Sequence, residues 1–501
     1  MNDNLDQLDF LGRDGVIFLG GYLVLLLFIG VLGHRAKKAA TLEDFYLGGR
    51  NMGFIVLLLT LYATQYSGNT LLGFVGKAYR GDFHFLVSVT FMMSIIGAYL
   101  VYAPALFRRS RKNGYITTGD FIQDRFGYRP LTVWASLLGV IALANYILTN
   151  LKVLGFLVER ISGGEISFAA GVVILAIVII LYELLGGLRA VAWTDVLQGV
   201  ILLFGILIIF IALQQHTGGL AAQAASLEQN KPGVFATPTG TEKITWASTL
   251  LLIFAGISMY PHAVQRIYAA RNEKTLRRSL QIMVFFPLIT TFLMVSLGIL
   301  GAAKFADLTQ EQSETVTLRL LADLVRESPG LRWLVILFIS AIVAGTMSTI
   351  DSSMLAISSK VTRDLFQPFF PGASEKALGL AGKGTSLALM SVIVYLTILL
   401  KDSKTIWRLI EIKLELLCQV APAVMLGVHW KRMKTGPVFA GMVAGTLLAV
   451  LISALESIPA KPLGIHGGVW GLLLNLLIVV VGSILMKDPT EDTSPRQSST
   501  A

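Results

Sequence analysis

Thirteen apolar stretches recur along this chain, and each is close to the length that an α-helix needs to cross a lipid bilayer. A helix rises about 1.5 Å per residue, so about 20 apolar residues span a hydrocarbon core of roughly 30 Å. Charged residues make up only 14% of the 501 residues, against about a quarter in a soluble protein. Because this deficit extends along the whole chain, the sequence predicts an all-α polytopic membrane protein. The stretches cover residues 16–33, 53–76, 84–106, 131–158, 167–187, 194–214, 244–263, 279–301, 333–357, 384–401, 406–428, 437–455 and 468–486.

Lysine and arginine gather in alternate connections between these stretches. The connections after odd-numbered stretches read HRAKK, FRRSRKNG, GGLRAVAWTD, RIYAARNEKTLRRS, KVTRDLF and HWKRMKTG, and the even-numbered ones carry fewer basic residues. Cytoplasmic loops are the basic ones in membrane proteins, so the pattern predicts an extracytoplasmic N-terminus and a cytoplasmic C-terminus. An odd number of spans agrees with this orientation. The net charge of +10 is then explained by cytoplasmic loops, and we expect no nucleic-acid partner.

Both ends of the chain are short and polar. Residues 1–15 are acidic and lack the basic start of a secretory signal peptide, so we expect an extracytoplasmic tail. Residues 487–501 are expected to form a cytoplasmic tail that carries no further domain. The single cysteine, Cys418, excludes an intramolecular disulfide.

The loops contain no motif of an enzyme active site. HExxH, GxxxxGK[ST] and GxSxG are all absent from the sequence. We therefore expect a transporter or a channel, and not an enzyme.

The stretch AGTMSTIDSSMLAISSK, residues 344–360, carries unusual polarity inside an apolar span. Gly345, Ser348, Thr349 and Ser352 follow one face of a helix, and their hydroxyl and carbonyl oxygens are ligands that hard cations prefer. Close helix packing through small residues is the alternative. Asp351 favours the cation, since packing does not require a carboxylate.

Two other spans contain polar positions at membrane depth. Residues 65–70 interrupt the second stretch around Gly68. This predicts either a discontinuous helix whose free carbonyls bind an ion or substrate, or a glycine kink whose hydroxyls bond to their own turn. Asp195 lies at the start of the sixth stretch, where it could also cap the helix N-terminus.

The eleventh stretch carries three charges. Glu411 and Glu415 share a helix face, and Lys413 points elsewhere. Lys152 is another cation at membrane depth. A pair between Glu415 and Lys152, a pair between a glutamate and Lys413, and direct substrate contact all remain open.

At these residues the sequence resembles the sodium/solute symporter family, which includes bacterial proline, pantothenate, monocarboxylate and sialic-acid symporters and animal sodium/glucose cotransporters. The similar stretches, in order, are EDFYLGGRNMG, ATQYSGNTLLGFVGKAY, YELLGGLRAVAWTDVLQG, AGTMSTIDSSMLAISSKVTRDLF and PAVMLGVHWKRMKTGPVFAGMVAG. They extend over essentially the whole chain.

The resemblance implies a leucine-transporter-type fold built from two inverted five-helix repeats around a site at the membrane midplane. The repeats would be residues 53–214 and 244–428, with one accessory helix before them at 16–33 and two after them within 437–486. In the seventh stretch, Gly256 and Pro261 are the expected break points that match the one at Gly68.

The resemblance also implies a principal sodium site. Its ligands would be the carbonyls of Ala63, Tyr66 and Gly345 and the side chains of Ser348 and Thr349. Where the proline branch of the family has an aspartate, this sequence has glutamine at position 65.

Some members of the family carry a second sodium site. In this sequence it would use Asp195, Ser348, Asp351 and Ser352, and the sialic-acid branch has serine where Asp351 stands. Two carboxylates around one Na⁺ leave a net negative charge, so one would be protonated or turned away. The number of sodium ions is therefore left open.

The function implied is secondary active symport by alternating access, with Na⁺ as the coupling ion, no organic cofactor and a small organic solute as substrate. An amino acid or a small carboxylate is the expected class, and Gln65, Ser67, Asn69, Asn150 and Ser258 are the expected substrate contacts. We expect a multi-pass protein of a bacterial inner membrane. The alternatives are a proton-coupled symporter of the same fold and a transporter-like membrane sensor.

His262 is interpreted either as a pH sensor or as a structural histidine near the cytoplasmic end of its helix. The sequence makes no prediction of the oligomeric state.

Overall fold

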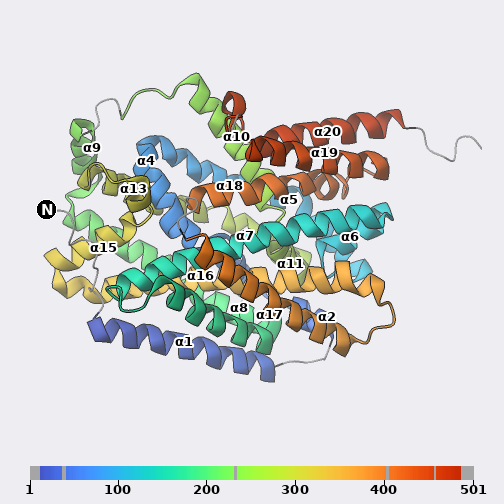
Figure 1. Ribbon diagram of the computed structural model, residues 1–501, viewed down its shortest axis with the longest axis horizontal. Helices are drawn as coiled ribbons and strands as arrows, with labels where there is room; N and C mark the ends of the chain where they lie inside the picture. The colour runs from blue at the N-terminus through green and yellow to red at the C-terminus, as the bar shows by residue number, and fades with distance from the viewer. Residues whose placement is uncertain (1–11, 37–40, 231–233, 402–405, 456–457, 487–501) are drawn as a thin grey trace, which may run out of the picture.

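The computed structural model describes residues 12–36, 41–230, 234–401, 406–455 and 458–486 (Figure 1). This part of the chain is helical throughout and contains no named strand, which confirms the all-α class. Met52 and Ala270 form an isolated parallel bridge. The expected tail at 487–501 lies outside the described residues, as does most of the tail at 1–15.

Nine helices of the described part are long and apolar enough to cross a membrane. They lie on α1 (Gly12–Arg35), α5 (Ser88–Asn113), α7 (Arg129–Ile161), α8 (Phe168–His216), α12 (Glu273–Met283) with α13 (Phe286–Lys304), α16 (Arg332–Lys360), α17 (Glu375–Leu399), α19 (Thr435–Ala454) and α20 (Gly467–Leu485). A tenth span joins α10 (Gly240–Ile257) and α11 (Pro261–Ala269) across a bend of 53°.

The shorter elements complete the chain. They are α2 (Leu42–Leu47), α3 (Phe54–Gln65), η2 (Asn69–Phe74), α4 (Val75–Gly81), η3 (Asp82–Val87), α6 (Thr118–Phe126), α9 (Gly219–Asn230), α14 (Gln310–Ser313), α15 (Val316–Glu327), η4 (Pro329–Leu331), η5 (Val361–Phe366), η6 (Gln367–Phe369), α18 (Ile406–Leu417), η7 (Cys418–Val420), η8 (Pro422–Leu426) and η9 (Pro462–Gly464).

The thirteen expected stretches map onto these helices, although not always one stretch to one helix. α8 contains the fifth and sixth stretches and bends between them at Gly187, whose φ of 57° and ψ of −156° are not helical. The second stretch is divided among α3, η2 and α4, and the eleventh among α18, η7 and η8. Such interrupted helices fail a simple length test, so the count of thirteen stays a prediction.

The break after α3 lies beside α16. A Cβ atom on Gly68 would collide with the Thr346 hydroxyl oxygen and would lie only 2.7 Å from a Val153 methyl carbon. Only glycine therefore allows the chain to pass this close to α16.

The second break differs in position from the expected one. Gly256 lies inside α10, and the chain leaves the helix at Ser258–Tyr260 before Pro261 begins α11. Proline suits this place because the first helical residue needs no N–H donor. Gly256 instead serves packing, since a Cβ atom there would lie 3.1 Å from the Leu414 carbonyl oxygen of α18.

α16 is the central helix of the molecule. Almost every residue from Val335 to Lys360 is buried, and the helix packs against α8, α7 and α3. α1 and the pair α19–α20 lie on opposite edges of the bundle (Figure 1).

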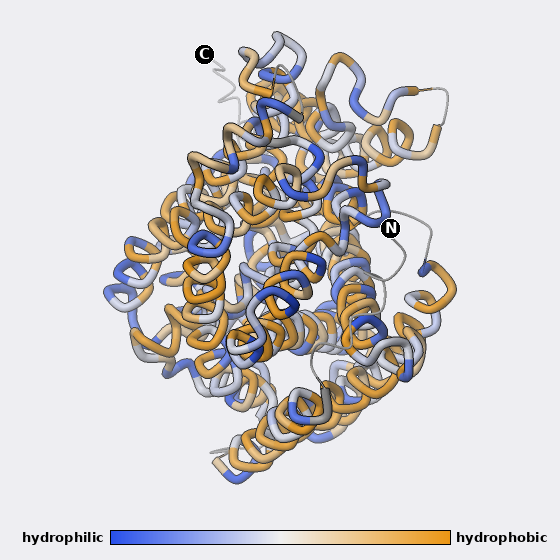
Figure 2. The backbone as a smooth tube through the Cα atoms, turned by 90° about the vertical axis from the view of Figure 1, so that its left-hand side faces the viewer, coloured by the Kyte–Doolittle hydropathy of each residue, from blue (hydrophilic) through white to orange (hydrophobic). Residues whose placement is uncertain are grey.

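Apolar side chains cover the outside of the bundle. Figure 2 shows hydrophobic residues running along the outer helices, with many of the hydrophilic ones at helix ends and connections. Large apolar side chains such as Ile17 and Ile484 are 72% and 69% exposed. A soluble monomer rarely exposes so much apolar surface, so this is the lipid-facing surface of a multi-pass membrane protein.

Candidate functional site

The candidate ion site lies where the break after α3 meets α16. A Cβ atom on Gly345 would lie 3.3 Å from the Tyr66 carbonyl oxygen, so the two backbones are in contact. The Thr349 hydroxyl donates to the Gly345 carbonyl at 3.0 Å. Ala63 lies in the last turn of α3, where carbonyls have no partner within the helix. The structure brings Tyr66, Gly345 and Thr349 together, and Ala63 and Ser348 belong to the same two helices, α3 and α16. Their role as sodium ligands stays a prediction.

Ser348 connects this junction to α8. Its hydroxyl donates to Oδ1 of Asp195 at 2.6 Å, and both side chains are fully buried. A hydroxyl oxygen keeps lone pairs after it has donated its proton. Ser348 therefore holds Asp195 in place, and its role as a sodium ligand stays a prediction.

Asp195 lies inside α8, well beyond the kink at Gly187, so the interpretation as an N-terminal cap is wrong. Its carboxylate accepts hydrogen bonds from the hydroxyls of Thr60 and Ser348. It also forms a salt bridge with Arg266 of α11, at 3.0 Å between Oδ2 and Nη2. The pair is fully buried and joins the two halves of the chain.

Arg266 is the residue that sequence reasoning missed. Its guanidinium donates to Asp195, to the Ser352 hydroxyl at 2.5 Å, to the Thr60 hydroxyl at 3.1 Å and to the His262 carbonyl at 3.1 Å. A positive charge of the protein itself thus lies among the residues expected to form the second sodium site. The expected seventh span ended at residue 263, so Arg266 was counted with the basic cytoplasmic loop. Pro261 and the preceding break were the signals that a buried helix continues there.

Asp351 faces the first half of α8. Its carboxylate accepts a hydrogen bond from the Tyr182 hydroxyl at 2.6 Å and one from Ser352 at 3.1 Å. Asp351 is thus held by the Tyr182 hydroxyl, whereas Asp195 pairs with Arg266. Ser352 therefore links Asp351 to Arg266 and Asp195 in one buried network.

A cavity of about 30 Å³ lies beside the break after α3. Gln65, Ser67 and Asn69 line it, as expected for substrate contacts. Gln65 donates to the Tyr99 hydroxyl at 2.6 Å, and Ser67 accepts from the Tyr146 hydroxyl at 3.3 Å. In the described part of the chain, Oε1 of Gln65 and both amide atoms of Asn69 have no hydrogen-bond partner. These free amide atoms are available to a solute.

The other two expected substrate contacts do not line this cavity. Asn150 donates to the Tyr146 carbonyl at 2.8 Å, and the Ser258 hydroxyl donates to the Phe254 carbonyl at 2.6 Å. Each side chain is thus bonded within its own helix. Tyr146 of α7 and Tyr260, the residue before α11, contribute to the cavity instead.

The glutamates of α18 find other partners than those expected. Glu411 pairs with Lys461 at 2.8 Å and with Arg408 at 3.1 Å, and Glu415 pairs with Arg408 at 3.3 Å. Among the described residues, no pair forms between either glutamate and Lys413. The Lys413 ammonium lies over the rings of two tyrosines, 3.3 Å from the centre of Tyr146 and 5.4 Å from that of Tyr260. Lys152 lies 5.8 Å from the centre of the Phe156 ring.

His262 belongs to the same aromatic group. Its ring stacks on Tyr146 with centroids 5.9 Å apart and lies 5.0 Å from the ring of Tyr260. The side chain is fully buried near the start of α11, and neither ring nitrogen has a hydrogen-bond partner within the described residues. This position is in the core beside the cavity and not at a cytoplasmic surface.

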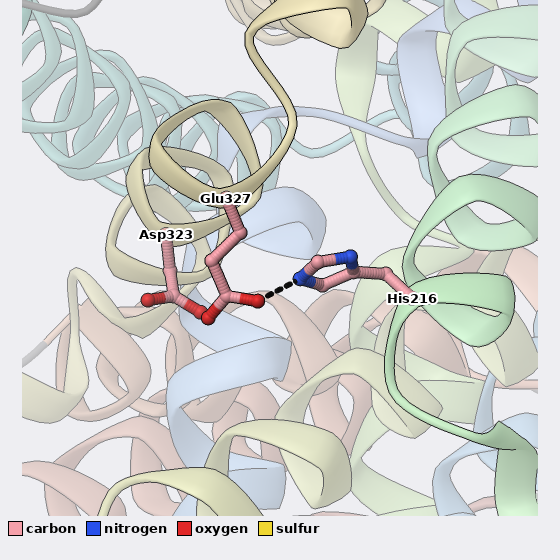
Figure 3. A group of neighbouring side chains, drawn as sticks. All are labelled: His216, Asp323 and Glu327. Atoms are coloured by element: carbon pink, nitrogen blue, oxygen red, sulfur yellow. Dashed lines mark ion pairs between the residues drawn. The ribbon is translucent and has the colours of Figure 1, made fainter.

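A second group of ionisable side chains lies away from the cavity. His216 at the end of α8 faces Asp323 and Glu327 of α15, and ligand atoms of all three lie within 4.8 Å of one another (Figure 3). Such residue types can bind Zn²⁺. However, Lys304 pairs with both carboxylates, at 3.5 Å for Glu327, and lowers the pKa of Glu327. The positive charge that a metal would supply is already present, so this group is an ion-pair cluster.

The fold and the buried site define a membrane transporter, because broken helices surround a buried cavity inside a bundle whose outer surface is apolar. The chain belongs to the sodium:solute symporter family, whose profile matches residues 45–445. It is therefore a sodium-coupled symporter and not an enzyme.

Similarity to individual relatives extends over nearly the whole chain. The high-affinity proline transporter PutP of Bacillus subtilis is 28% identical over 93% of this chain and 97% of its own length. The sodium/pantothenate symporter of Escherichia coli is 27% identical over 93% and 96%. The structure of a Na⁺-coupled sialic acid symporter in a substrate-bound outward-open state superimposes with a TM-score of 0.76 at 21% identity, covering 96% of this chain and 99% of that one. The crystal structure of MhsT with L-phenylalanine gives a TM-score of 0.50 at 16% identity, over 86% and 96%.

Proposed function

We propose that this protein imports a small organic solute, an amino acid or a small carboxylate, across a bacterial inner membrane by Na⁺-driven alternating access. One observation carries the proposal: the Tyr66 and Gly345 backbones and the Thr349 hydroxyl meet at the break that also supplies Gln65 and Asn69 to the cavity. Proline and pantothenate, the solutes in the relatives' names, both fall within the proposed class.

Coupling follows from the position of the break. Na⁺ at the junction of α3 and α16 would fix the break, and the same residues 65–69 form one wall of the cavity. Ion and solute then stabilise the same arrangement, so each raises the affinity for the other. The membrane potential adds about 2.3 kcal/mol per charge per 100 mV, which is enough to concentrate a small solute.

We also propose a coupling ratio of one Na⁺. Arg266 already neutralises Asp195 within the expected second site, and Asp351 is held by Tyr182. A second Na⁺ would have to displace a buried, hydrogen-bonded guanidinium, which is costly. The Na⁺ dependence of uptake is then expected to have a Hill coefficient of about 1.

A transported solute needs an entrance to the cavity. Phe74 and Trp407 line it, and Phe85 contacts both rings at centroid distances of 5.8 and 5.2 Å. His84, the residue before Phe85, lines a wider hollow of about 470 Å³ together with Trp246. The hollow lies on the side predicted to be extracytoplasmic, so the three aromatic rings would close the outer entrance.

Thr349→Val, which keeps the volume but removes the hydroxyl, tests the sodium site. The loss of one cation ligand should raise the Na⁺ concentration for half-maximal uptake by roughly tenfold or more, since a bond to a charged group contributes about 1.5–3 kcal/mol. Uptake of labelled proline and pantothenate into proteoliposomes measures it. Ser340→Ala is the control, because the Ser340 hydroxyl bonds to the Ile336 carbonyl of its own helix, away from the junction.

Three outcomes would contradict the proposal. An unchanged Na⁺ dependence in Thr349→Val would remove the ion from the α3–α16 junction. Uptake that persists without Na⁺ and collapses with a protonophore would establish the proton-coupled alternative. Solute-dependent recruitment of a partner without any uptake would establish the sensor.

A further inference from the structure

Lys413 is a buried cation at the centre of the molecule. Its side chain is 1% exposed, and it lines the cavity together with Gln65, Ser67 and Asn69. It lies on α18, opposite the break after α3, so a solute in the cavity would lie between the two.

In the described part of the chain, Lys413 has no carboxylate partner. Other buried cations do: Arg266 pairs with Asp195 at 3.0 Å, and Lys360 with Asp364 at 3.6 Å. Glu411 also lines the cavity, but Lys461 and Arg408 already neutralise it. The cavity therefore contains one neutralised carboxylate and one ammonium without a counter-ion.

The two tyrosine rings hold the ammonium in this position. Nζ lies 3.3 Å from the centre of Tyr146 and 5.4 Å from that of Tyr260. Cation–π contacts offset part of the cost of burying a charge, but a charge in a low-dielectric interior is normally also paired. The Tyr146 hydroxyl also donates to Ser67, so Tyr146 connects Lys413 to the break after α3.

We propose that Lys413 binds a carboxylate of the transported solute, while the free amide atoms of Asn69 and Gln65 bind its uncharged polar part. This inference rests on the proposed function and narrows it: the solute must carry a carboxylate, and a neutral solute of the same shape is rejected. Rejection follows because a neutral group would leave the ammonium both desolvated and unpaired.

Matched pairs of solutes provide the test. Lactate and lactamide, pantothenate and panthenol, and benzoate and benzamide differ mainly in the carboxylate. Thermal unfolding of the purified full-length protein is measured with each compound, in NaCl and in choline chloride. At least one carboxylate should raise the unfolding temperature in NaCl, and its neutral counterpart should not.

Variants then assign the effect to one side chain. Lys413→Gln should weaken binding of that carboxylate on the order of 100-fold, which corresponds to losing one partner of a buried charge pair. Lys413→Arg retains the charge and should recover part of the affinity. Lys401→Gln is the matched control, since Lys401 pairs with Glu159 at 3.1 Å and does not line the cavity.

The result separates this inference from the proposed function. Stabilisation by NaCl alone should be the same in Lys413→Gln and in the wild-type protein, which also shows that the variant is folded. Carboxylate binding that needs Lys413 but not Na⁺ would contradict sodium coupling and leave the inference standing. The inference is overturned if neutral counterparts bind as well as the acids, if no carboxylate binds, or if Lys413→Gln keeps its affinity.

Discussion

Arg266 and Asp195 form a buried ion pair between α11 and α8, so the loss of either partner leaves a charge without compensation. Arg266→Met should destabilise the protein by about 3–5 kcal/mol. The double variant with Asp195→Asn should recover much of this loss, because no buried charge remains. Thermal unfolding in the absence of solute, compared across the four proteins of the double-mutant cycle, measures the coupling. Additive losses in the double variant would show that the pair does not act as a unit.

The stability of the protein should also depend on pH through Glu327 of α15, which lies beside His216 at the C-terminal end of α8. Lys304 lowers its pKa below the ordinary value of 4.5. A carboxyl whose folded pKa is depressed contributes stability that is present above its unfolded pKa and is lost as the pH falls through the folded value. Since Glu327 is half exposed, the effect should be under about 1 kcal/mol.

Glu327→Gln measures this contribution. The difference in unfolding temperature between the wild-type protein and Glu327→Gln should be constant near neutral pH and shrink below pH 4.5. In the background of Lys304→Met the difference should be smaller at every pH. A difference that grows on acidification would reverse the sign and reject the assignment.

Single residues also differ in how far the sequence predicts their contacts. Periodicity placed Ser348 and Thr349 on one helix face, because a helix fixes its own side-chain spacing. It could not find the contact of Lys413 with Tyr146 or of Arg266 with Asp195, since each joins residues far apart in the chain. The first contact places an ammonium against an aromatic ring, and the second pairs two opposite charges. Both depend on tertiary packing.

At the scale of elements, the kink in α8 depends on one residue, Gly187. Gly187 has a φ of 57° and a ψ of −156°, a conformation open essentially to glycine alone, and its Cβ would lie 2.5 Å from the Phe45 carbonyl oxygen. Gly187→Ala should therefore destabilise the protein by at least about 1–3 kcal/mol and lower the unfolding temperature.

The control is Gly97→Ala in α5, where no atom lies within 4 Å of the added Cβ. Alanine favours a helix over glycine by about 0.5–1 kcal/mol, so this change should be neutral or stabilising. Equal effects of the two substitutions would show that the kink is not held by Gly187.

The elements themselves were predictable to different degrees. Long apolar runs such as 131–158 became single helices, because burial in lipid and internal hydrogen bonding both favour them. The break at Gly68 followed from polar residues in an apolar run. The seventh stretch was harder, since Gly256 and Pro261 are both breaking residues, yet Gly256 lies inside α10 and packs against Leu414.

At the scale of the whole molecule, connections that were predicted to share a side of the membrane touch one another. On the expected outer side, Arg80 pairs with Glu314 at 2.9 Å and Lys401 with Glu159 at 3.1 Å. On the other side, the Arg125 guanidinium donates to the Trp430 carbonyl at 2.9 Å. These contacts support the alternation of the loops, but they leave open which face is cytoplasmic.

Thiol labelling in intact cells decides the orientation. In a Cys418→Ser background the chain has no other cysteine, and a single cysteine replaces either Thr237 or Gly372. Both positions are exposed and lie in connections after the sixth and ninth spans, which the positive-inside rule places outside and inside. A membrane-impermeant maleimide should label Thr237→Cys in intact cells, and Gly372→Cys only after the cells are permeabilised. The reverse pattern would invert the orientation, whereas labelling of both in intact cells would break the alternation between the sixth and ninth spans.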